Sequence, residues 1–329
     1  MSAAVTTFRR DPARSMQVLF RDQPVIPLAG LLVVLVIVMQ IAQPGIVTLN
    51  WANVIVRGAI PLAILAGCQT LTMLTGGIDL SVGAIASMAG FVTATFVNSA
   101  GGPAEGILVA LVVAMVAGLV TGIGVGVFRV HPLIMTLGMS FIVLGFANVW
   151  QLQNVQTGAG VPSMLTALGT GTILGFIPTG LLVFVPLALV ILIGLRRTGY
   201  GRLLYAVGDN PIAARLSGAR SWQVLVTLYV ISARLAGIAG LLLSGFTNTA
   251  SVSLADSSVL PSVAAAVIGG TSIMGGRGGY GGSMVGALIL SVLAALLTVL
   301  GLPEASRQIV FGAIIVIVAA AYTRVTAEG

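Results

Sequence analysis

The chain has 329 residues, of which 57% are hydrophobic and only 7% are charged, and its net charge is +7. Because soluble domains carry about 25% charged residues, this composition excludes a water-soluble enzyme, and the long continuous apolar runs exclude an outer-membrane barrel. A helical crossing of a bilayer needs about 20 apolar residues, so the chain has material for roughly eight to ten crossings. We therefore predict an all-α, polytopic bundle in the bacterial inner (plasma) membrane.

Ten apolar spans are predicted along the chain, with glycine- or proline-rich or polar separators between them. They form a transmembrane domain over 25–324, between a tail at 1–24 and a tail at 325–329. The span at 258–274 is the weakest, since it is short and begins with polar residues, so it either crosses or forms a re-entrant hairpin. The ten spans are about 25–43, 51–75, 81–98, 105–128, 132–150, 179–195, 222–245, 258–274, 282–300 and 307–323.

The basic residues predict the orientation of these spans. All fifteen are arginines, and if the N-terminal tail is cytoplasmic, twelve of them fall in cytoplasmic segments. Arg307 alone falls outside, while Arg57 and Arg234 lie within spans. Because arginine-rich loops stay on the cytoplasmic side, this asymmetry predicts an even number of spans with both termini cytoplasmic.

Glycines recur at four-residue spacing within the span at 105–128. Gly118, Gly122 and Gly126 would lie on one face of a helix. Small residues at this spacing let two membrane helices approach closely, so this face is predicted to pack against another helix.

The longest predicted cytoplasmic loop, 196–221, contains the signals of a short helix. Asn210 can cap a helix, Pro211 suits its first position, and Gly218 can end it in the left-handed conformation. These residues predict a helix over 211–217 on the cytoplasmic face.

The predicted short helix has a small apolar stripe. Ile212 and Leu216 are one helical turn apart, and Ala213 and Ala214 would let a partner approach closely. The stripe favours a docking role, and the alternative is a solvated loop that only links two helices.

Asp79 lies between a glycine pair and the start of the span at 81–98. Asp79 or Ser81 can accept N–H bonds at the start of that helix, where the helix dipole favours a negative group. The alternative is a polar group that lines the transport pathway or a gate. The predicted topology places Asp79 near the cytoplasmic edge of the membrane, which favours the cap.

Three stretches resemble motifs of the ribose-type ABC transporter permeases, and they occur in that family's order. Residues 75–84 (TGGIDLSVGA) are similar to its GGIDLSVG signature, and residues 198–218 (TGYGRLLYAVGDNPIAARLSG) are similar to its cytoplasmic coupling loop. Residues 266–279 (AVIGGTSIMGGRGG) are similar to its late glycine-rich motif. The similarity extends over nearly the whole chain.

The resemblance implies a ten-helix permease subunit with three kinds of protein partner. These are a cytoplasmic ABC ATPase, a periplasmic sugar-binding protein, and a second permease subunit that forms a homo- or heterodimer with this chain. The ATPase would bind and hydrolyse ATP, so no cofactor is expected on this chain. By position, the ATPase-coupling role falls on Gly208, Asn210, Ala213, Ala214, Ser217 and Gly218, and the structural motif residues are Gly76, Gly77, Asp79, Ser81, Gly269 and Gly270.

The chain itself offers little material for catalysis. It has no Walker motif, and with one histidine and one cysteine it has no metal-ligand cluster and no nucleophile–histidine–acid set. The glycine-rich stretch at 278–282 lacks the Lys-Ser/Thr ending of a phosphate loop. The high isoelectric point reflects the orientation of the chain in the membrane. The expected partner is therefore the lipid bilayer, and no nucleic-acid partner is expected.

The function predicted from the sequence is import of a sugar or sugar-like polyol by alternating access. Within ABC permeases the alternative substrate is a branched-chain amino acid or a nucleoside, and a different class would be an ion-coupled secondary transporter. No acidic residue lies deep in a span, which disfavours ion coupling. The candidate pathway residues, which are polar within or at the ends of spans, are Asn53, Gln69, Thr72, Asn148, Gln151 and Arg234.

Overall fold

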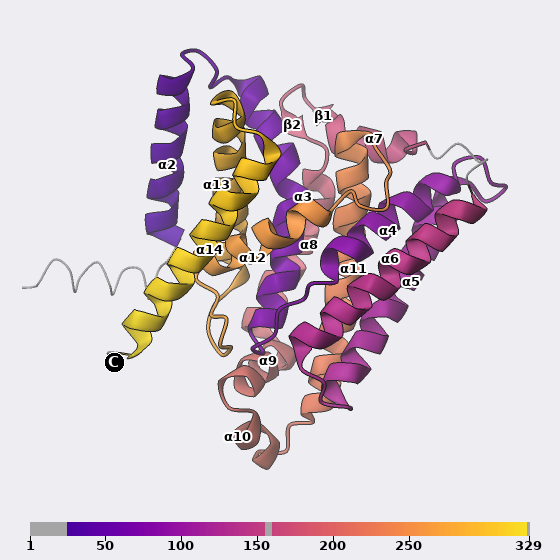
Figure 1. The fold of residues 1–329 in the computed structure, drawn as a ribbon, viewed down its shortest axis with the longest axis vertical. Coiled ribbons are helices and arrows are strands. Elements are labelled where there is room, and N and C mark those ends of the chain that lie inside the picture. The colour runs from indigo at the N-terminus through magenta and orange to yellow at the C-terminus, as the bar shows by residue number, and fades with distance from the viewer. Residues whose placement is uncertain (1–24, 155–159, 328–329) are drawn as a thin grey trace, which may run out of the picture.

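The structure is a computed structural model that describes residues 25–154 and 160–327. Within these residues it is a bundle of helices with one small antiparallel hairpin, in which Ile173 pairs with Ile177 (Figure 1). The predicted tail at 1–24 and residues 328–329 lie outside the described residues. In chain order the elements are α2 (Val25–Ala42), α3 (Leu49–Met73), α4 (Val82–Thr95), α5 (Gly102–Gly126), α6 (Pro132–Gln153), α7 (Ser163–Thr170), β1 (Thr172–Ile173), β2 (Ile177–Pro178), α8 (Leu181–Arg197), α9 (Gly199–Asp209), α10 (Pro211–Leu216), α11 (Ser221–Thr247), η2 (Asp256–Ser258), α12 (Val259–Ile268), α13 (Tyr280–Val299) and α14 (Glu304–Ala327).

Every predicted span coincides with a helix, so the polytopic, all-α class is confirmed. Six helices (α2, α3, α5, α6, α11 and α13) are long and apolar enough to cross a membrane, and α8 with α9, bent by 67°, passes as a pair. The count of ten crossings stays a prediction, because α4 and α12 are shorter than a bilayer requires.

The bundle has two distinct ends, which serve as landmarks below. The α10 end carries α9, α10 and the last turn of α3, and the α7 end carries α7 and the β1–β2 hairpin (Figure 1). Helix α11 runs from one to the other, since its first turn follows α10 and Gly245 near its end packs on Leu165 of α7.

The span predicted at 81–98 contains α4, which covers residues 82–95 of it. Helix α4 has 14 residues, all of them buried, which correspond to about 21 Å. The chain reaches it from the α10 end through the non-helical segment 74–81. This segment contains Gly76 with φ +76° and the Gly76–Gly77 pair, which favour a turn over a continuous helix.

The weak span predicted at 258–274 contains α12, which has only 10 residues, or about 15 Å. The chain returns from the α7 end of α11 through η2 and α12, and then through a glycine-rich loop, before α13 begins. The first residues of η2 and α12 lie against the start of α4, where the Ser87 hydroxyl accepts a 2.8 Å hydrogen bond from Ala255 N. Two short helices thus meet with their N-termini inside the bundle.

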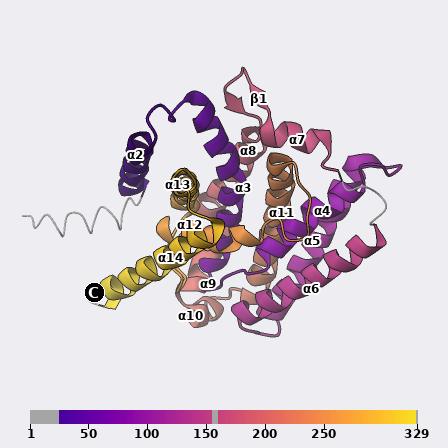
Figure 2. The ribbon, with the colours of Figure 1, turned by 45° about the horizontal axis from the view of Figure 1, so that its top comes forward.

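Helix α11 is the centre of the bundle. Figure 2 shows it between α3 on one side and α4 and α5 on the other. The predicted glycine face of α5 packs on it: a Cβ at Gly118 would lie 2.5 Å from the Tyr229 carbonyl oxygen, and one at Gly122 would lie 2.7 Å from Val226 Cα. The prediction of a close helix contact is confirmed.

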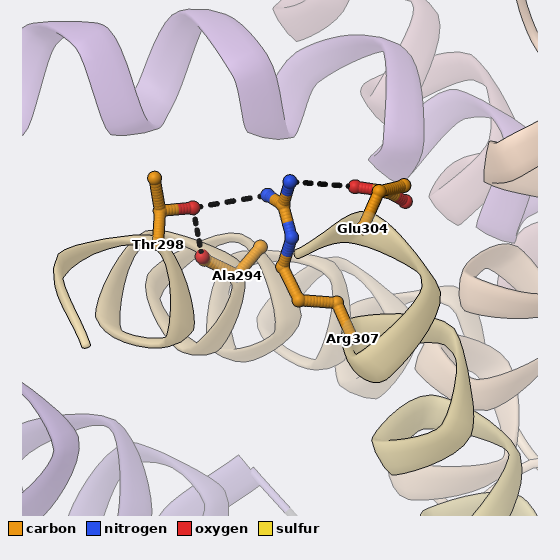
Figure 3. Close-up of polar contacts among 4 residues, drawn as sticks. All are labelled: Ala294, Thr298, Glu304 and Arg307. Carbon is orange, nitrogen blue, oxygen red and sulfur yellow. Dashed lines mark hydrogen bonds and ion pairs between the residues drawn. The ribbon is translucent and has the colours of Figure 1, made fainter. Parts of the chain in front are cut away.

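A polar clamp joins the end of α13 to the start of α14 (Figure 3). Arg307 forms a 2.8 Å ion pair with Glu304, and its other terminal nitrogen donates a 2.9 Å hydrogen bond to the Thr298 hydroxyl. Thr298 in turn donates to the Ala294 carbonyl at 2.7 Å. Glu304 lies in the first turn of α14, where the helix dipole favours an acid. The clamp fixes the tight connection between these two helices.

Replacement of Gly122 by alanine is expected to lower the free energy of unfolding by about 1–3 kcal/mol, because the new methyl group overlaps the main chain of α11. The measurement is the apparent melting temperature of the detergent-purified protein. Gly138→Ala in α6 is the matched control, since a Cβ at Gly138 meets nothing within 4 Å. Equal melting temperatures for the two variants would contradict close packing of α5 on α11.

Candidate functional site

The α10 end is built on a sharp bend between α8 and α9. The Thr198 hydroxyl donates a 2.6 Å hydrogen bond to the Gly194 carbonyl and accepts one of 3.1 Å from Gly201 N. A side chain at Gly201 would overlap the carbonyl oxygen of Leu195. Thr198 therefore ends one helix and caps the next, and α9 crosses the end of the bundle.

Helix α10 matches the helix predicted over 211–217. The Asn210 Oδ1 accepts hydrogen bonds of 3.1 Å from Ile212 N and 2.9 Å from Ala213 N, which is the expected cap. Gly218 has φ +87°, which is the left-handed conformation predicted for the residue that ends the helix. The local sequence therefore determines this helix through its two ends.

The predicted apolar stripe on α10 faces away from the bundle. Ile212 is 65% exposed and Leu216 is 85% exposed. Ala213 is exposed as well, whereas Ala214 is 7% exposed and supports the helix from its inner side. The expectation that Ala214 lets a partner approach closely stays a prediction, and its side of the helix faces the bundle.

A cavity of about 730 Å³ lies between α9, α10 and the first turns of α11. Five of the six predicted coupling residues line it: Asn210, Ala213, Ala214, Ser217 and Gly218. Gln223 and Thr227 line it from α11. The sixth predicted coupling residue, Gly208, has a different role.

Gly208 lies where α9 meets two loops that are distant in sequence. A Cβ at Gly208 would overlap the Leu74 carbonyl oxygen and would lie 2.8 Å from Gly276 N. The same carbonyl accepts a 2.9 Å hydrogen bond from Gly276 N. We call this contact of Leu74, Gly208 and Gly276 the glycine junction. It joins Leu74, which directly precedes the 75–84 motif, to residues inside the 198–218 and 266–279 motifs.

A side-chain hydrogen bond reinforces the glycine junction. The Tyr205 hydroxyl on α9 donates to the Gly278 carbonyl at 2.9 Å. Burial raises the pKa of the Tyr205 phenol, and the charge of Arg196 partly offsets this, so the hydroxyl remains a donor at neutral pH. The late glycine-rich loop is thus fixed to α9 at two points.

The predicted motif glycines make turns and close contacts. Gly76 and Gly270 have φ values of +76° and +87°, which side-chain-bearing residues rarely adopt. A Cβ at Gly77 would lie 3.0 Å from the Tyr229 hydroxyl oxygen, and one at Gly269 would overlap the main chain of Ser283. The structure thus gives these four residues a conformational or packing reason to be glycine.

Asp79 is buried inside the bundle and bonds to α11. Its carboxyl group accepts hydrogen bonds from Ser81 N at 3.0 Å, from the Ser81 hydroxyl at 2.5 Å and from the Ser232 hydroxyl at 2.9 Å. Ser232 follows the start of α11 by eleven residues, or roughly 16 Å. Segment 74–81 therefore enters the bundle before α4 begins, and the position of Asp79 relative to the membrane edge stays a prediction.

The predicted cap of α4 is present only in part. Asp79 does accept the N–H group of Ser81, which immediately precedes the helix, but the Ser81 side chain makes no capping hydrogen bond to α4. Instead, the Ser81 hydroxyl donates to Asp79. The carboxyl group also connects this helix start to α11, which a simple cap would not do.

Two of the predicted pathway residues are fully buried in α3. The Gln69 side chain bonds both main-chain groups of Asp79, with Nε2 donating to O at 2.8 Å and Oε1 accepting from N at 3.2 Å. The Thr72 hydroxyl donates to the carbonyls of Cys68 and Gln69 within its own helix. A substrate role for either residue stays a prediction, and these bonds hold segment 74–81 and α3 together.

The other four pathway candidates lie on three helices and do not form one cluster. Asn53 is buried in α3, while Asn148 and Gln151 are exposed on α6. Asn148 donates a 2.9 Å hydrogen bond to the Leu144 carbonyl in its own helix. Arg234 is exposed at the centre of α11. Their part in substrate passage stays a prediction.

Sequence reasoning missed the residues that anchor segment 74–81 and the late glycine-rich loop from other helices. The Thr136 hydroxyl accepts from Leu80 N and donates to the Ile78 carbonyl, each at 3.1 Å. Ser283 contacts the Thr70 hydroxyl at 2.6 Å. Each is one small hydroxyl residue within an apolar span, and no local pattern distinguishes it. Among the described residues, no group of three or more histidine, cysteine or acidic side chains could hold a metal ion.

Comparison with known proteins connects these features with transport. The chain is 35% identical to the ribose import permease protein RbsC of Bacillus subtilis over 88% of this chain and 90% of that protein. It is 32% identical to the fructose import permease protein FrcC of Rhizobium meliloti over 79% of this chain and 74% of that protein. It is 34% identical to the probable ABC transporter permease protein YphD of Escherichia coli over 88% of this chain and 87% of that protein. No solved structure matches the chain.

A family-level match covers the described bundle from the start of α3 into α14. Residues 50–319 match the family described as the permease component of branched-chain amino acid transport systems. This range includes all three motif stretches, the glycine junction and α10. The chain therefore belongs to this family of multi-pass membrane permease components.

Proposed function

We propose that this chain is the membrane-spanning subunit of an ATP-binding cassette importer for a sugar or sugar-like polyol. A separate cytoplasmic ATPase binds and hydrolyses ATP, and this chain itself provides the alternating pathway. The names of the ribose and fructose import permeases, which the chain resembles over most of its length, support the substrate class.

The observation that carries the proposal is the exposed stripe of α10 on a rigid base. Ile212 and Leu216 project from a helix whose two ends are fixed by Asn210 and Gly218. Burial of one such side chain against a partner contributes about 1.5–3 kcal/mol. Two such side chains on a short, capped helix therefore form a binding surface for an ATPase.

The glycine junction gives the route by which a movement of α10 reaches the bundle. Helix α9 directly precedes α10 in the chain, and Gly208 near its end packs directly on the main chain of Leu74 and Gly276. From Leu74 the chain continues to Asp79, which is bonded to Ser232 of α11. From Gly276 it continues into α13. Closure of the ATPase would therefore act on α3, α4, α11 and α13 together.

This function assigns an orientation and a set of partners to the two ends of the bundle. The α10 end is cytoplasmic, as are both termini, and the α7 end receives substrate from a periplasmic sugar-binding protein. Arginines of the 196–221 loop lie at the α10 end, in agreement with the rule that such loops stay inside. A second permease subunit completes the pathway.

The description of the family favours one other substrate class, since it names branched-chain amino acids. A thermal-shift screen of the associated binding protein separates the two classes. Pentoses, hexoses and polyols are tested against leucine, isoleucine and valine. Stabilisation by a sugar or polyol is the expected result, and stabilisation by an amino acid alone would overturn the proposed substrate class.

Replacement of both Ile212 and Leu216 by serine is expected to weaken ATPase binding by about 1.5–3 kcal/mol for each side chain. The measurements are co-purification of the ATPase and ATP-dependent uptake by proteoliposomes, and both should fall at least tenfold. Val190→Ser is the control, because Val190 is 69% exposed in the middle of α8, away from both ends of the bundle. Normal uptake by the double variant would contradict docking through α10.

Replacement of Gly208 by alanine is expected to separate ATP hydrolysis from transport, because the methyl group forces α9 away from Leu74 and Gly276. The ATPase should still bind, since the surface of α10 is unchanged, while uptake per ATP hydrolysed falls several-fold. Gly199→Ala in the same helix is the matched control, because the nearest atom to its Cβ is a side-chain nitrogen of Arg202 at 3.7 Å. Equal transport ratios in the two variants would refute a coupling role for the junction.

A further inference from the structure

Arg234 lies at the midpoint of the longest helix of the described bundle. Thirteen residues of α11 precede it and thirteen follow it, so it is about 20 Å from either end. Half of a bilayer's hydrocarbon core is about 15 Å thick. An arginine reaches the headgroups only from near a helix end, so this side chain cannot leave the membrane interior by snorkelling.

No group in the described part of the chain neutralises this arginine. Its side chain is exposed and makes neither a hydrogen bond nor an ion pair with the described residues. The ion pair among those residues joins Arg307 and Glu304. Asp79 bonds Ser232, which is two residues away and therefore on the opposite side of α11. Against lipid, an unpaired arginine at this depth costs about 2.5–3.5 kcal/mol or more, so another environment must hold it.

Arg234 belongs to a polar face that begins in the cavity at the α10 end. Gln223, Thr227 and Arg234 are separated by four and seven residues, which places them on one face of the helix, and all three are exposed. Gln223 and Thr227 line the cavity between α9, α10 and α11. We call these three residues the α11 polar track. The track therefore runs from an open cavity to the midpoint of α11.

The polar track stops one or two turns beyond Arg234. Leu241, seven residues further along the same face, is 6% exposed, and Gly245 lies against the main chain of Leu165 in α7. The face is thus open toward the α10 end and covered at the α7 end. Its single charged group lies at the inner end of the open part, where an entering or leaving solute would meet it.

We propose that Arg234 binds the anionic group of the transported solute, and that the substrate is therefore a sugar or polyol that carries a carboxylate or a phosphate. A guanidinium group presents a planar set of donors that matches either group, and such charge-assisted pairs are stronger than neutral hydrogen bonds. Arg234 then selects charged over neutral sugars. This inference rests on the proposed import function and adds a substrate class to it.

The first test measures water access and charge along the polar track, without knowledge of the substrate. Cys68 is the single cysteine of the chain and is buried, so a Cys68→Ser background is suited to introduced cysteines. In inside-out vesicles of native membranes that contain the full transporter, T227C and R234C should react with impermeant anionic and cationic methanethiosulfonates, because the α10 end then faces the medium. Val190→Cys on the exposed apolar face of α8 is the unreactive control. An R234C as unreactive as V190C would overturn the proposal, since the arginine would then face lipid or a sealed interface.

The positive charge of Arg234 should also speed the reaction of the anionic reagent with a cysteine at position 227, relative to the cationic reagent. The ratio of anionic to cationic reaction rates at T227C is expected to fall roughly threefold to tenfold when R234Q is added, because one positive charge is lost about 10 Å away. R234K should restore the ratio. An unchanged ratio in R234Q would contradict an electrostatic role for this residue on the track.

The second test measures selectivity directly in proteoliposomes with the binding protein and ATPase. The labelled probes are D-gluconate, D-ribose 5-phosphate, D-ribose and D-fructose. The wild type should take up one of the two anionic probes at least tenfold faster than the neutral ones, and R234Q should lose that preference. Uptake of neutral probes alone, unchanged in R234Q, would overturn the anion inference but keep the import function. Lack of ATP-dependent uptake for all four probes would reject both.

Discussion

Contact between main chains at Gly208 holds the functional end of the molecule together. The carbonyl oxygen of Leu74 accepts a hydrogen bond from Gly276 N and lies against the Cα of Gly208, where no side chain would fit. No side chain therefore separates the three segments. Loops of this kind would be mobile if they were joined only by long side chains. With a backbone contact, a displacement of one segment must displace the others, because interiors at this density have no free volume to absorb it.

The rest of the α10 end depends on this contact. Helix α10 has only six residues and could not resist a load by itself, since isolated short helices are marginal in water. It is held by the bend at Thr198 and by α9, which rests on Leu74 and Gly276. Deeper in the bundle, Gln69 and Thr136 satisfy the main-chain groups of segment 74–81, which would otherwise be unpaired away from water. The polar groups of the interior therefore keep a non-helical segment in place.

The sequence was sufficient for features that depend on local chemistry. Asn210, Pro211 and Gly218 predicted α10 because a cap, a first-turn proline and a left-handed end act within a few residues. The hydropathy of the spans predicted the helices because each apolar run is long. The same reasoning did not show that segment 74–81, between α3 and α4, is non-helical inside the bundle, since hydropathy does not report where a buried segment stops being helical. Thr136, Ser232 and Ser283 act through contacts with distant parts of the chain, so no local pattern could identify them.

A junction made of backbone has a consequence for how such a transporter can be altered. In the proposed mechanism, a side chain such as Arg234 on α11 can be exchanged by itself to change what is carried, because it acts through its own chemistry. Gly208 has no side chain to exchange and no space for one, so the drive mechanism offers nothing to tune by substitution. An engineer who wants a new cargo can therefore leave residues 196–221 and their partner loops untouched and vary only the helix faces along the route. The part that receives the force and the part that chooses the solute are separable in design.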